Sequence, residues 1–197
     1  FATGNGALGT EPENDAIVAL DWNTLAVKAI WTVPSNQSAG TDSDFGSSCM
    51  LVPNIGGGQR GVICHNKNGY LYAVTETGTL SWSKQLGFGG ESPEIDQGDI
   101  TSGTYDGRYV YYTTTSVAIN GVTYQSAVYC VDPTTGTIVW TTPIAQGYPL
   151  TATTGAGNIL VVGLTSSNPT QPSNVLVLSM KTGAILFSYA LPTSIYG

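Results

Sequence analysis

The stretch that decides the fold is AVYCVDPTTGTIVW, residues 127–140. It opens with β-branched and aromatic side chains, passes through a Pro-Thr-Thr-Gly turn, and ends in a short apolar run closed by Trp140. β-Branched and aromatic residues favour strands, and glycine supplies the positive φ that tight turns require. The stretch therefore predicts a β-hairpin that ends in an aromatic side chain.

Three other stretches repeat this pattern. They are AIVALDWNTLAVKAIW (16–31), YLYAVTETGTLSW (70–82) and VLVLSMKTGAILF (175–187). Their aromatic ends and that of the first stretch, which are Trp31, Trp82, Trp140 and Phe187, follow one another at 51, 58 and 47 residues. The first copy is looser, with two extra residues and no glycine in its turn. An all-strand repeat of this length is typical of four-stranded propeller blades.

The unit from residue 99 to 144 contains all four strands of such a blade. DITSGTYD (99–106) is expected as the inner strand and RYVYYTTTS (108–116) as the second, followed by SAVYCVD (126–132) and TIVWTTPI (137–144). Asp-Gly, Asn-Gly and Thr-Gly pairs fall between these strands, as hairpin turns require. An immunoglobulin-like sandwich would not repeat an aromatic-ended unit at blade length.

We therefore predict an all-β fold, a β-propeller of four-stranded antiparallel blades. The 197 residues form a single propeller segment with four approximate blades, 1–36, 37–90, 91–146 and 147–197.

Composition agrees with this fold and limits the function. Charged residues make up 10% of the chain and hydrophobic residues 41%, which argues against disorder and against a helical surface. The net charge of −7 would repel a polyanion, so we expect no nucleic-acid partner. No apolar run approaches the ~20 residues of a membrane span. Phe1 opens within a strand pattern, so we expect a mature form or a fragment of a longer chain.

Cys49 and Cys64 flank a sequence that is symmetric about its glycine turn, CMLVPNIGGGQRGVIC. A hairpin would place the two residues opposite each other, at a separation compatible with a disulfide. Two reduced core cysteines are the alternative. A sequon begins at Asn36 and is either a glycosylation site or a chance match. Low charge, abundant Ser and Thr and the possible disulfide favour an extracytoplasmic location.

The turn of the opening stretch carries a more specific signal. Asp132, Thr135, Gly136 and Trp140 form D-x-x-T-G-x-x-x-W, which resembles the tryptophan-docking motif of quinoprotein (PQQ-type) β-propellers. In that family the tryptophan stacks between neighbouring blades, and the aspartate and threonine bind the turn. The other copies depart from the motif, since Thr75 and Ser179 occupy the aspartate position and Phe187 replaces the last tryptophan. The family closes with eight blades, so the resemblance implies about half of a ring.

Three short segments resemble the cofactor site of that family, and their order is closest to its alcohol dehydrogenase branch, particularly the polyvinyl-alcohol-dehydrogenase-like members. FATGNG implies that Asn5 binds the calcium ion beside the quinone. DSDFGSS implies that Asp44 is the catalytic aspartate, placed beside the metal and followed by the aromatic Phe45. CHNKNGYLYAV implies that Lys67 hydrogen-bonds the quinone oxygens.

Blade topology predicts that these residues share one end of the propeller. The loop before an inner strand and the loop after a second strand lie on the same face, because the strands alternate in direction. Asp44 precedes the inner strand of its unit, Lys67 follows the second strand, and Asn5 follows the second strand of the preceding unit. The residue types suit the chemistry, since calcium takes oxygen ligands, a carboxylate can act as general base and a cation stabilises a reduced quinone.

Other site interpretations have less support. Asp42, Asp44 and Gly46 match the start of a calcium loop, but the further acidic ligands of an EF-hand are absent from the sequence. His65, the single histidine, is expected to be structural, with no second histidine or suitably spaced cysteine pair to form a zinc site. Glu91 and Glu94 could suggest a glycosidase, although Pro93 and their context favour a linker between blades.

Two functions follow from the sequence. The first is a portion of a quinoprotein alcohol dehydrogenase-like protein that transfers hydride from a small or polymeric alcohol to calcium-bound PQQ. The family's acidic calcium ligand, its quinone-stacking tryptophan and its vicinal cysteines have no match in these 197 residues. The second is a non-catalytic propeller that serves as a structural, self-assembling or protein-interaction module. The expected partners are the remaining half of the propeller or other copies of the chain, because half a ring exposes blade flanks and strand edges.

Overall fold

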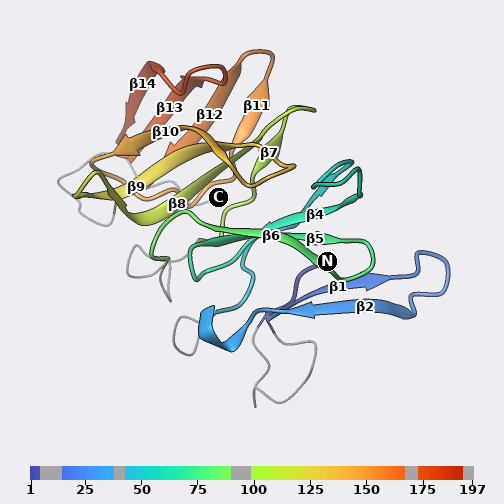
Figure 1. Ribbon diagram of the computed structural model, residues 1–197. Coiled ribbons are helices and arrows are strands. Elements are labelled where there is room, and N and C mark those ends of the chain that lie inside the picture. The colour runs from blue at the N-terminus through green and yellow to red at the C-terminus, as the bar shows by residue number, and fades with distance from the viewer. Residues whose placement is uncertain (5–14, 38–42, 90–98, 167–172, 193–197) are drawn as a thin grey trace.

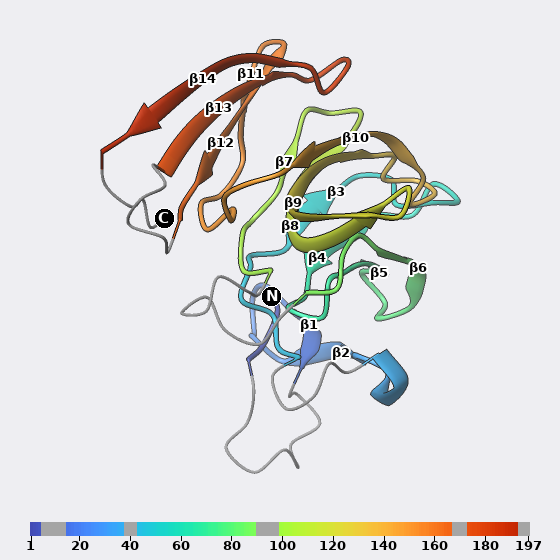
Figure 2. The ribbon, with the colours of Figure 1, turned by 90° about the vertical axis from the view of Figure 1, so that its left-hand side faces the viewer.

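The computed structural model describes residues 1–4, 15–37, 43–89, 99–166 and 173–192. In this part the chain forms four antiparallel sheets that follow one another around an arc, as the views in Figures 1 and 2 show. A short 3-10 helix, η1 (Ser35–Gln37), follows the first sheet. The arrangement is that of part of a β-propeller, as the repeat pattern predicts.

Each sheet is formed by strands that are consecutive in the sequence. The first contains β1 (Ala16–Leu20) and β2 (Val27–Thr32), with residues 1–3 paired to β1 through an Ala2–Ile17 bridge. The second contains β3 (Met50–Val52), β4 (Gly61–His65), β5 (Tyr70–Thr75) and β6 (Leu80–Gln85). The third contains β7 (Thr104–Tyr105), β8 (Val110–Ile119), β9 (Val122–Val131) and β10 (Ile138–Ile144). The fourth contains β11 (Thr154–Ala156), β12 (Ile159–Leu164), β13 (Ser173–Ser179) and β14 (Ile185–Leu191).

The inner strand of the third sheet is shorter than the sequence predicts. The prediction covered residues 99–106, whereas β7 contains Thr104 and Tyr105 alone. Side-chain bonds hold the segment before β7 instead, because the Thr101 and Thr113 hydroxyls lie 2.8 Å apart and Asp99 is bonded to β8. Polar side chains thus replace the backbone ladder along this part of the inner edge.

The core lies between the sheets, where one sheet packs its face on the next. The largest cluster joins the second and third sheets and includes Val52, Leu71, Val110 and Tyr129. Similar clusters lie between the first and second sheets and between the third and fourth. Such burial of apolar faces is the main favourable contribution to the stability of the stack.

Tryptophans of the outer strands β6 and β10 dock the second sheet onto the third and the third onto the fourth, as the resemblance implies. Trp82 Nε1 donates to the carbonyl oxygen of Pro133 at 2.9 Å, and Trp140 Nε1 donates to that of Met180 at 3.0 Å. A Cβ atom added at Gly136 or at Gly183 would lie within 2.7 Å of the indole of Trp82 or Trp140, respectively. Glycine is therefore required at these turns both for its positive φ and for the close approach of the ring.

The register corrects the alignment of the first repeat. In each sheet, the pairing of the outer strand with its neighbour contains one register shift. The first outer-strand residue that is paired beyond the shift is Trp82 in β6, Trp140 in β10, Phe187 in β14 and Ala29 in β2. Ala29 thus occupies the docking position that the sequence pattern gave to Trp31, and Gly78 of the next sheet packs on its Cβ. Trp31 contacts Tyr72 instead, with ring centroids 4.7 Å apart. The two extra residues of this repeat place its tryptophan two residues beyond the docking position.

The hairpin of β3 and β4 is closed by a disulfide. Cys49 and Cys64 are bonded, with Cα atoms 4.4 Å apart, and this resolves the choice between a disulfide and two reduced cysteines. Cys130 is buried with a thiol that forms no disulfide.

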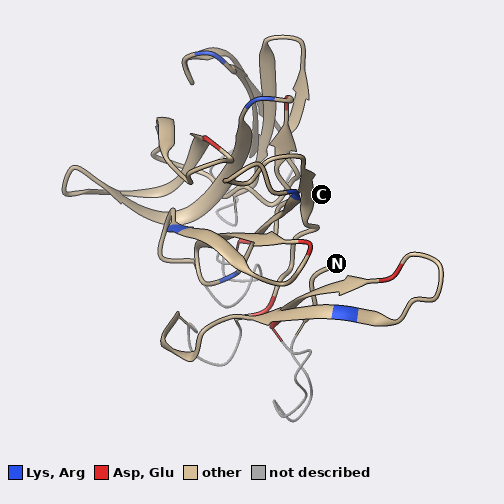
Figure 3. Cartoon of the chain, turned by 45° about the vertical axis from the view of Figure 1, so that its right-hand side comes forward, with Lys and Arg blue, Asp and Glu red and all other residues tan. Residues whose placement is uncertain are grey.

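Charged side chains are few and scattered in the described part of the chain (Figure 3). No helix among the described residues is long and apolar enough to span a membrane.

Candidate functional site

The candidate site lies at the loop end of the second sheet, where the segment before β3 meets the turn between β4 and β5. Lys67 Nζ lies 2.6 Å from Asp44 Oδ1, and the Lys67 backbone N–H donates to the Asp44 carbonyl oxygen at 3.2 Å. The two side chains keep 14% and 16% of their surface exposed. An ion pair that is mostly desolvated is screened less by salt than a surface pair.

Neighbouring bonds fix the segment that carries Asp44. Asn66 Nδ2 donates to the Ser43 carbonyl oxygen at 2.6 Å, and the Ser47 hydroxyl donates to the His65 carbonyl oxygen at 2.8 Å. The segment around Asp44 is therefore bonded on both sides to the end of β4 and to the turn after it, which carries Lys67. This leaves the Asp44 carboxylate a limited range of positions.

Phe45 anchors the same segment in the core. Its side chain is 7% exposed, and its ring lies edge-on to Tyr72 with centroids 6.2 Å apart. The Phe45 N–H donates to the Thr3 carbonyl oxygen at 3.3 Å, which ties the segment to the first sheet. Phe45 thus holds the segment that carries Asp44 against the core.

The chain near the third predicted residue reaches the same place. A Cβ atom added at Gly4 would lie 3.3 Å from Asp44 Oδ2, so the backbone of Gly4 passes close to the carboxylate. Asn5 itself lies outside the described residues, as do Asp42, Glu91 and Glu94. The structure thus brings Asp44 and Lys67 together, and their proposed roles stay predictions.

A second polar pair lies behind this site and has no local signal in the sequence. His65 Nε2 lies 3.3 Å from Asp99 Oδ2, and both side chains are almost fully buried. Asp99 also accepts the Thr114 hydroxyl at 2.5 Å and the Thr115 N–H at 2.8 Å, so the pair joins the second sheet to the third. His65 is buried in this pair, and its partner is 34 residues away and could not be found from spacing.

The metal-binding capacity of the site is limited. No group of three or more His, Cys, Asp or Glu side chains that could hold a metal ion occurs in the part of the chain that the structure describes. Calcium takes six to eight oxygen ligands, and the described site offers the carboxylate of Asp44. Asn5 would add one oxygen, and backbone carbonyl groups or water would have to supply the others.

No protein-family model matches the chain, and no curated protein sequence matches it. Solved structures do. Quinohemoprotein alcohol dehydrogenase from Comamonas testosteroni is 15% identical with a TM-score of 0.64, over 99% of this chain and 39% of that one. A europium-containing methanol dehydrogenase is 14% identical with a TM-score of 0.65, over 99% and 44%. BamB from Moraxella catarrhalis is 16% identical with a TM-score of 0.59, over 91% and 49%. These are β-propellers, and the chain spans less than half of each.

Proposed function

We propose that the chain supplies part of the active site of a quinoprotein alcohol dehydrogenase-like protein. The observation that carries this proposal is the contact between Asp44 and Lys67, two residues that the resemblance assigns to one site from separate segments. The likeness in fold to quinohemoprotein alcohol dehydrogenase and methanol dehydrogenase supports the same function. The disulfide supports an extracytoplasmic location, where such bonds persist.

The residues at this end of the sheet suit the two kinds of contact that a calcium-bound quinone needs. Asp44, with Asn5, would give oxygen ligands to calcium, and Lys67 would donate to the oxygens of PQQ. When bound, PQQ supplies the acceptor for the hydride of the alcohol.

The protein side of the reaction follows from the pair. Asp44 removes the proton of the alcohol hydroxyl as general base, because an ionised carboxylate accepts a proton from a donor within hydrogen-bond reach. Lys67 orients Asp44 through the 2.6 Å contact between their side chains, and its ammonium group has three N–H donors. The same cation stabilises negative charge that develops nearby, an effect that grows as water is excluded.

Binding of PQQ tests the cofactor contact separately from catalysis. We expect the complete protein to bind PQQ in the presence of calcium, measured by quenching of tryptophan fluorescence. Lys67→Met should weaken this binding by about tenfold or more, because a charge-assisted hydrogen bond is lost. Lys84→Met, on the outer strand β6, is the matched control and should bind as the wild type does. Equal affinity in both variants would remove Lys67 from the site.

A non-catalytic interaction module is the second candidate, and one observation favours it. The outer strand β14 exposes four large apolar or aromatic side chains, which are Ile185, Leu186, Phe187 and Tyr189, at 48–59% of their surface. Contiguous exposed apolar surface commonly marks a site of protein interaction. A complete protein that binds neither PQQ nor calcium, but associates through this face, would support the second function.

A further inference from the structure

The turn that carries Lys67 places it between two buried asparagines. Asn66 is 0% exposed and Asn68 is 3% exposed, whereas asparagine is mostly found in contact with water. A buried amide is costly unless its N–H and C=O groups are hydrogen-bonded. The partners of the two side chains therefore show what each asparagine does.

Both side chains use their carbonyl oxygen in the same way. Asn66 Oδ1 accepts the Asn68 N–H at 2.9 Å, and Asn68 Oδ1 accepts the Tyr70 N–H at 3.0 Å. Asparagine commonly holds a turn by accepting from the backbone two residues on. These two bonds are local and account for the shape of the turn.

The amide donors of the two asparagines reach different segments. Asn68 Nδ2 donates to the Gln37 carbonyl oxygen and to the Tyr72 hydroxyl, both at 2.8 Å. Asn66 Nδ2 donates at 2.6 Å to the carbonyl oxygen of Ser43, a residue that is 2% exposed. Because both residues of this last bond are buried, water does not compete for it. Asn66 thus holds the segment that carries the proposed base.

The bond to Ser43 fixes one of the two peptide groups that flank Asp44. The Ser43 carbonyl belongs to the peptide that precedes Asp44, and the Lys67 N–H donates at 3.2 Å to the carbonyl oxygen of the peptide that follows. Consecutive residues of one turn, Asn66 and Lys67, therefore hold the backbone on both sides of Asp44. The turn thereby sets the relative position of the Asp44 carboxylate and the Lys67 ammonium group, which lie 2.6 Å apart.

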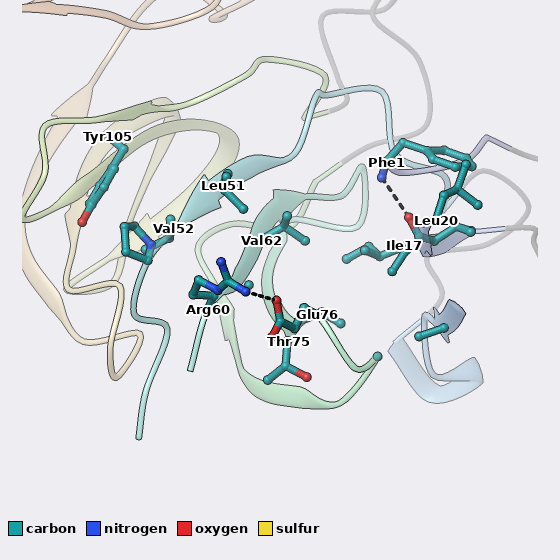
Figure 4. A pocket seen from close by; sticks show the side chains of 17 residues that line it. Phe1, Ile17, Leu20, Leu51, Val52, Arg60, Val62, Thr75, Glu76 and Tyr105 are labelled. Atoms are coloured by element: carbon teal, nitrogen blue, oxygen red, sulfur yellow. Dashed lines mark hydrogen bonds and ion pairs between the residues drawn. The ribbon is translucent and has the colours of Figure 1, made fainter. Parts of the chain in front are cut away.

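An exposed ion pair of the same sheet shows why this backbone support matters. Arg60 and Glu76, with side chains 70% and 61% exposed, lie 2.9 Å apart among the residues that line a pocket between the first two sheets (Figure 4). Long side chains with this exposure adjust in water to a shift of their backbone. Lys67 and Asp44 are 14% and 16% exposed and have less room to adjust, so their backbone decides their geometry.

We propose that Asn66 is a positioning residue of the site, whose side-chain amide aligns the Asp44 carboxylate with the Lys67 ammonium group and with the reacting alcohol. The role rests on the proposed function, in which Asp44 is the base. Asparagine suits it because one side chain is both donor and acceptor, and so holds the turn and the Ser43 carbonyl together. A small misplacement of a catalytic group lowers the rate steeply, and loss of this bond releases the segment that carries the base.

Asn66→Asp isolates the bond to Ser43. An ionised carboxylate keeps the acceptor for the Asn68 N–H but has no donor for the Ser43 carbonyl oxygen. Asn68→Asp is the matched control, because it adds the same charge on the other side of Lys67 and keeps the acceptor for the Tyr70 N–H. Asn66→Ala removes the donor without adding a charge.

The first measurement needs no cofactor and uses NMR of the complete protein with isotope-labelled lysine. The ammonium signal of Lys67 is identified by its absence from Lys67→Met. We expect its protons to exchange with water more slowly than those of Lys28, whose side chain is 59% exposed. Asn66→Asp and Asn66→Ala should lose this slow exchange, because the pair is no longer held together. Asn68→Asp should retain it.

The second measurement is alcohol-dependent dye reduction by the complete protein with PQQ and calcium. Asn66→Asp and Asn66→Ala should lower kcat by about tenfold or more, because the base is misplaced. Asn68→Asp should keep a kcat near that of the wild type. The KM for the alcohol and the Kd for PQQ should be the same in Asn66→Asp and Asn68→Asp, so that the loss in Asn66→Asp lies in kcat.

In an active wild type, a change in only one of the two readouts, in neither, or to an equal degree in Asn66→Asp and Asn68→Asp overturns the proposal. Failure of both Asn66 variants to fold, measured by circular dichroism, also overturns it, because the residue would then be structural. A wild type that binds PQQ but does not oxidise alcohols, while its Lys67 signal responds to Asn66→Asp and not to Asn68→Asp, has a different meaning. The proposed function then fails, and the hold of Asn66 on the ion pair is supported.

Discussion

Trp140 rests its indole ring on the backbone of Gly183 and donates from Nε1 to the carbonyl oxygen of Met180, 3.0 Å away. One residue of the third sheet thereby fixes the turn between the last two strands of the fourth. Trp82 makes the same contact with Gly136 and Pro133. Two copies of the sequence repeat thus make the same contact between neighbouring sheets, from the tryptophan of one sheet to the turn of the next.

Gly183→Ala should break one such joint. The added Cβ would lie 2.6 Å from Trp140 Cε3, at a residue with φ of 73°. Gly121→Ala is the matched control, because Gly121 has φ of 78° and no atom within 4 Å of the added Cβ. Strain at positive φ costs about 1 kcal/mol in either variant. We expect Gly183→Ala to lower the free energy of unfolding by about 2 kcal/mol more than the control in urea denaturation. Equal losses of unfolding free energy in the two variants would mean that the Trp140 ring does not pack closely on Gly183.

The buried His65–Asp99 pair should contribute strongly to the contact between the second and third sheets. Asp99→Asn or His65→Ala leaves a buried polar group without its partner, which costs about 3 kcal/mol. Glu76→Gln, which breaks the exposed pair with Arg60, should change stability by less than about 1 kcal/mol. Thermal or urea unfolding measures the stability of these variants. If the variants of the buried pair lost no more stability than Glu76→Gln, the proposed role of the buried pair would be contradicted.

The Cys49–Cys64 disulfide should stabilise the β3–β4 hairpin. It closes a loop with a sequence separation of 15, and such a loop corresponds to about 3 kcal/mol of stability. We expect a reductant to lower the midpoint of thermal unfolding of the wild type. A variant with alanine at both positions should start near that lower midpoint and not respond to the reductant. A response of the double variant would trace the effect to something other than this bond.

Stability should fall in alkali because buried tyrosines resist ionisation. Burial, with the charge of Asp99 in addition, raises the pKa of Tyr129 to about 12, and burial raises the pKa of Tyr72 to about 12 against an opposing hydrogen bond from Asn68. A folded-state pKa above the unfolded value of 10 gives stability that is complete below pH 10 and is lost as the pH rises toward 12. Each such group lowers the free energy of unfolding by about 1.4 kcal/mol per pH unit in that window.

Tyr129→Phe isolates one of these groups. The Tyr129 hydroxyl donates to the Leu86 carbonyl oxygen at 2.7 Å, so the variant should lose some stability at pH 8. Its slope of unfolding free energy against pH should nevertheless be shallower than that of the wild type between pH 10 and 11. Parallel slopes would show that Tyr129 ionises as readily in the folded state as in the unfolded one.

The sequence predicted the sheets because their signals are local. Alternating strand residues and the Thr-Gly and Asn-Gly turns specify hairpins over about ten residues. The contact of Asp44 with Lys67 was also within reach, because strand direction decides which loops share an end of the sheet. The position of Cys49 opposite Cys64 followed from the symmetry of one hairpin, whereas the sequence left open whether the two thiols are bonded.

The features that sequence reasoning missed depend on packing between distant segments. His65 and Asp99 meet across two sheets, and nothing near either residue indicates the other. Ala29 takes a docking position because the longer first turn shifts the register, although Trp31 has the expected side chain. The short β7 reflects a choice between backbone and side-chain hydrogen bonds that composition does not determine.

The central claim is that Asp44 acts as the base of a quinoprotein-type site. Alcohol-dependent reduction of an artificial dye by the complete protein, supplied with PQQ and calcium, tests it most directly. We expect activity that requires PQQ, falls by about 100-fold or more in Asp44→Asn because the general base is lost, and is unchanged in Glu76→Gln. Activity in Asp44→Asn equal to that of the wild type, or a wild type inactive with PQQ bound, would contradict it.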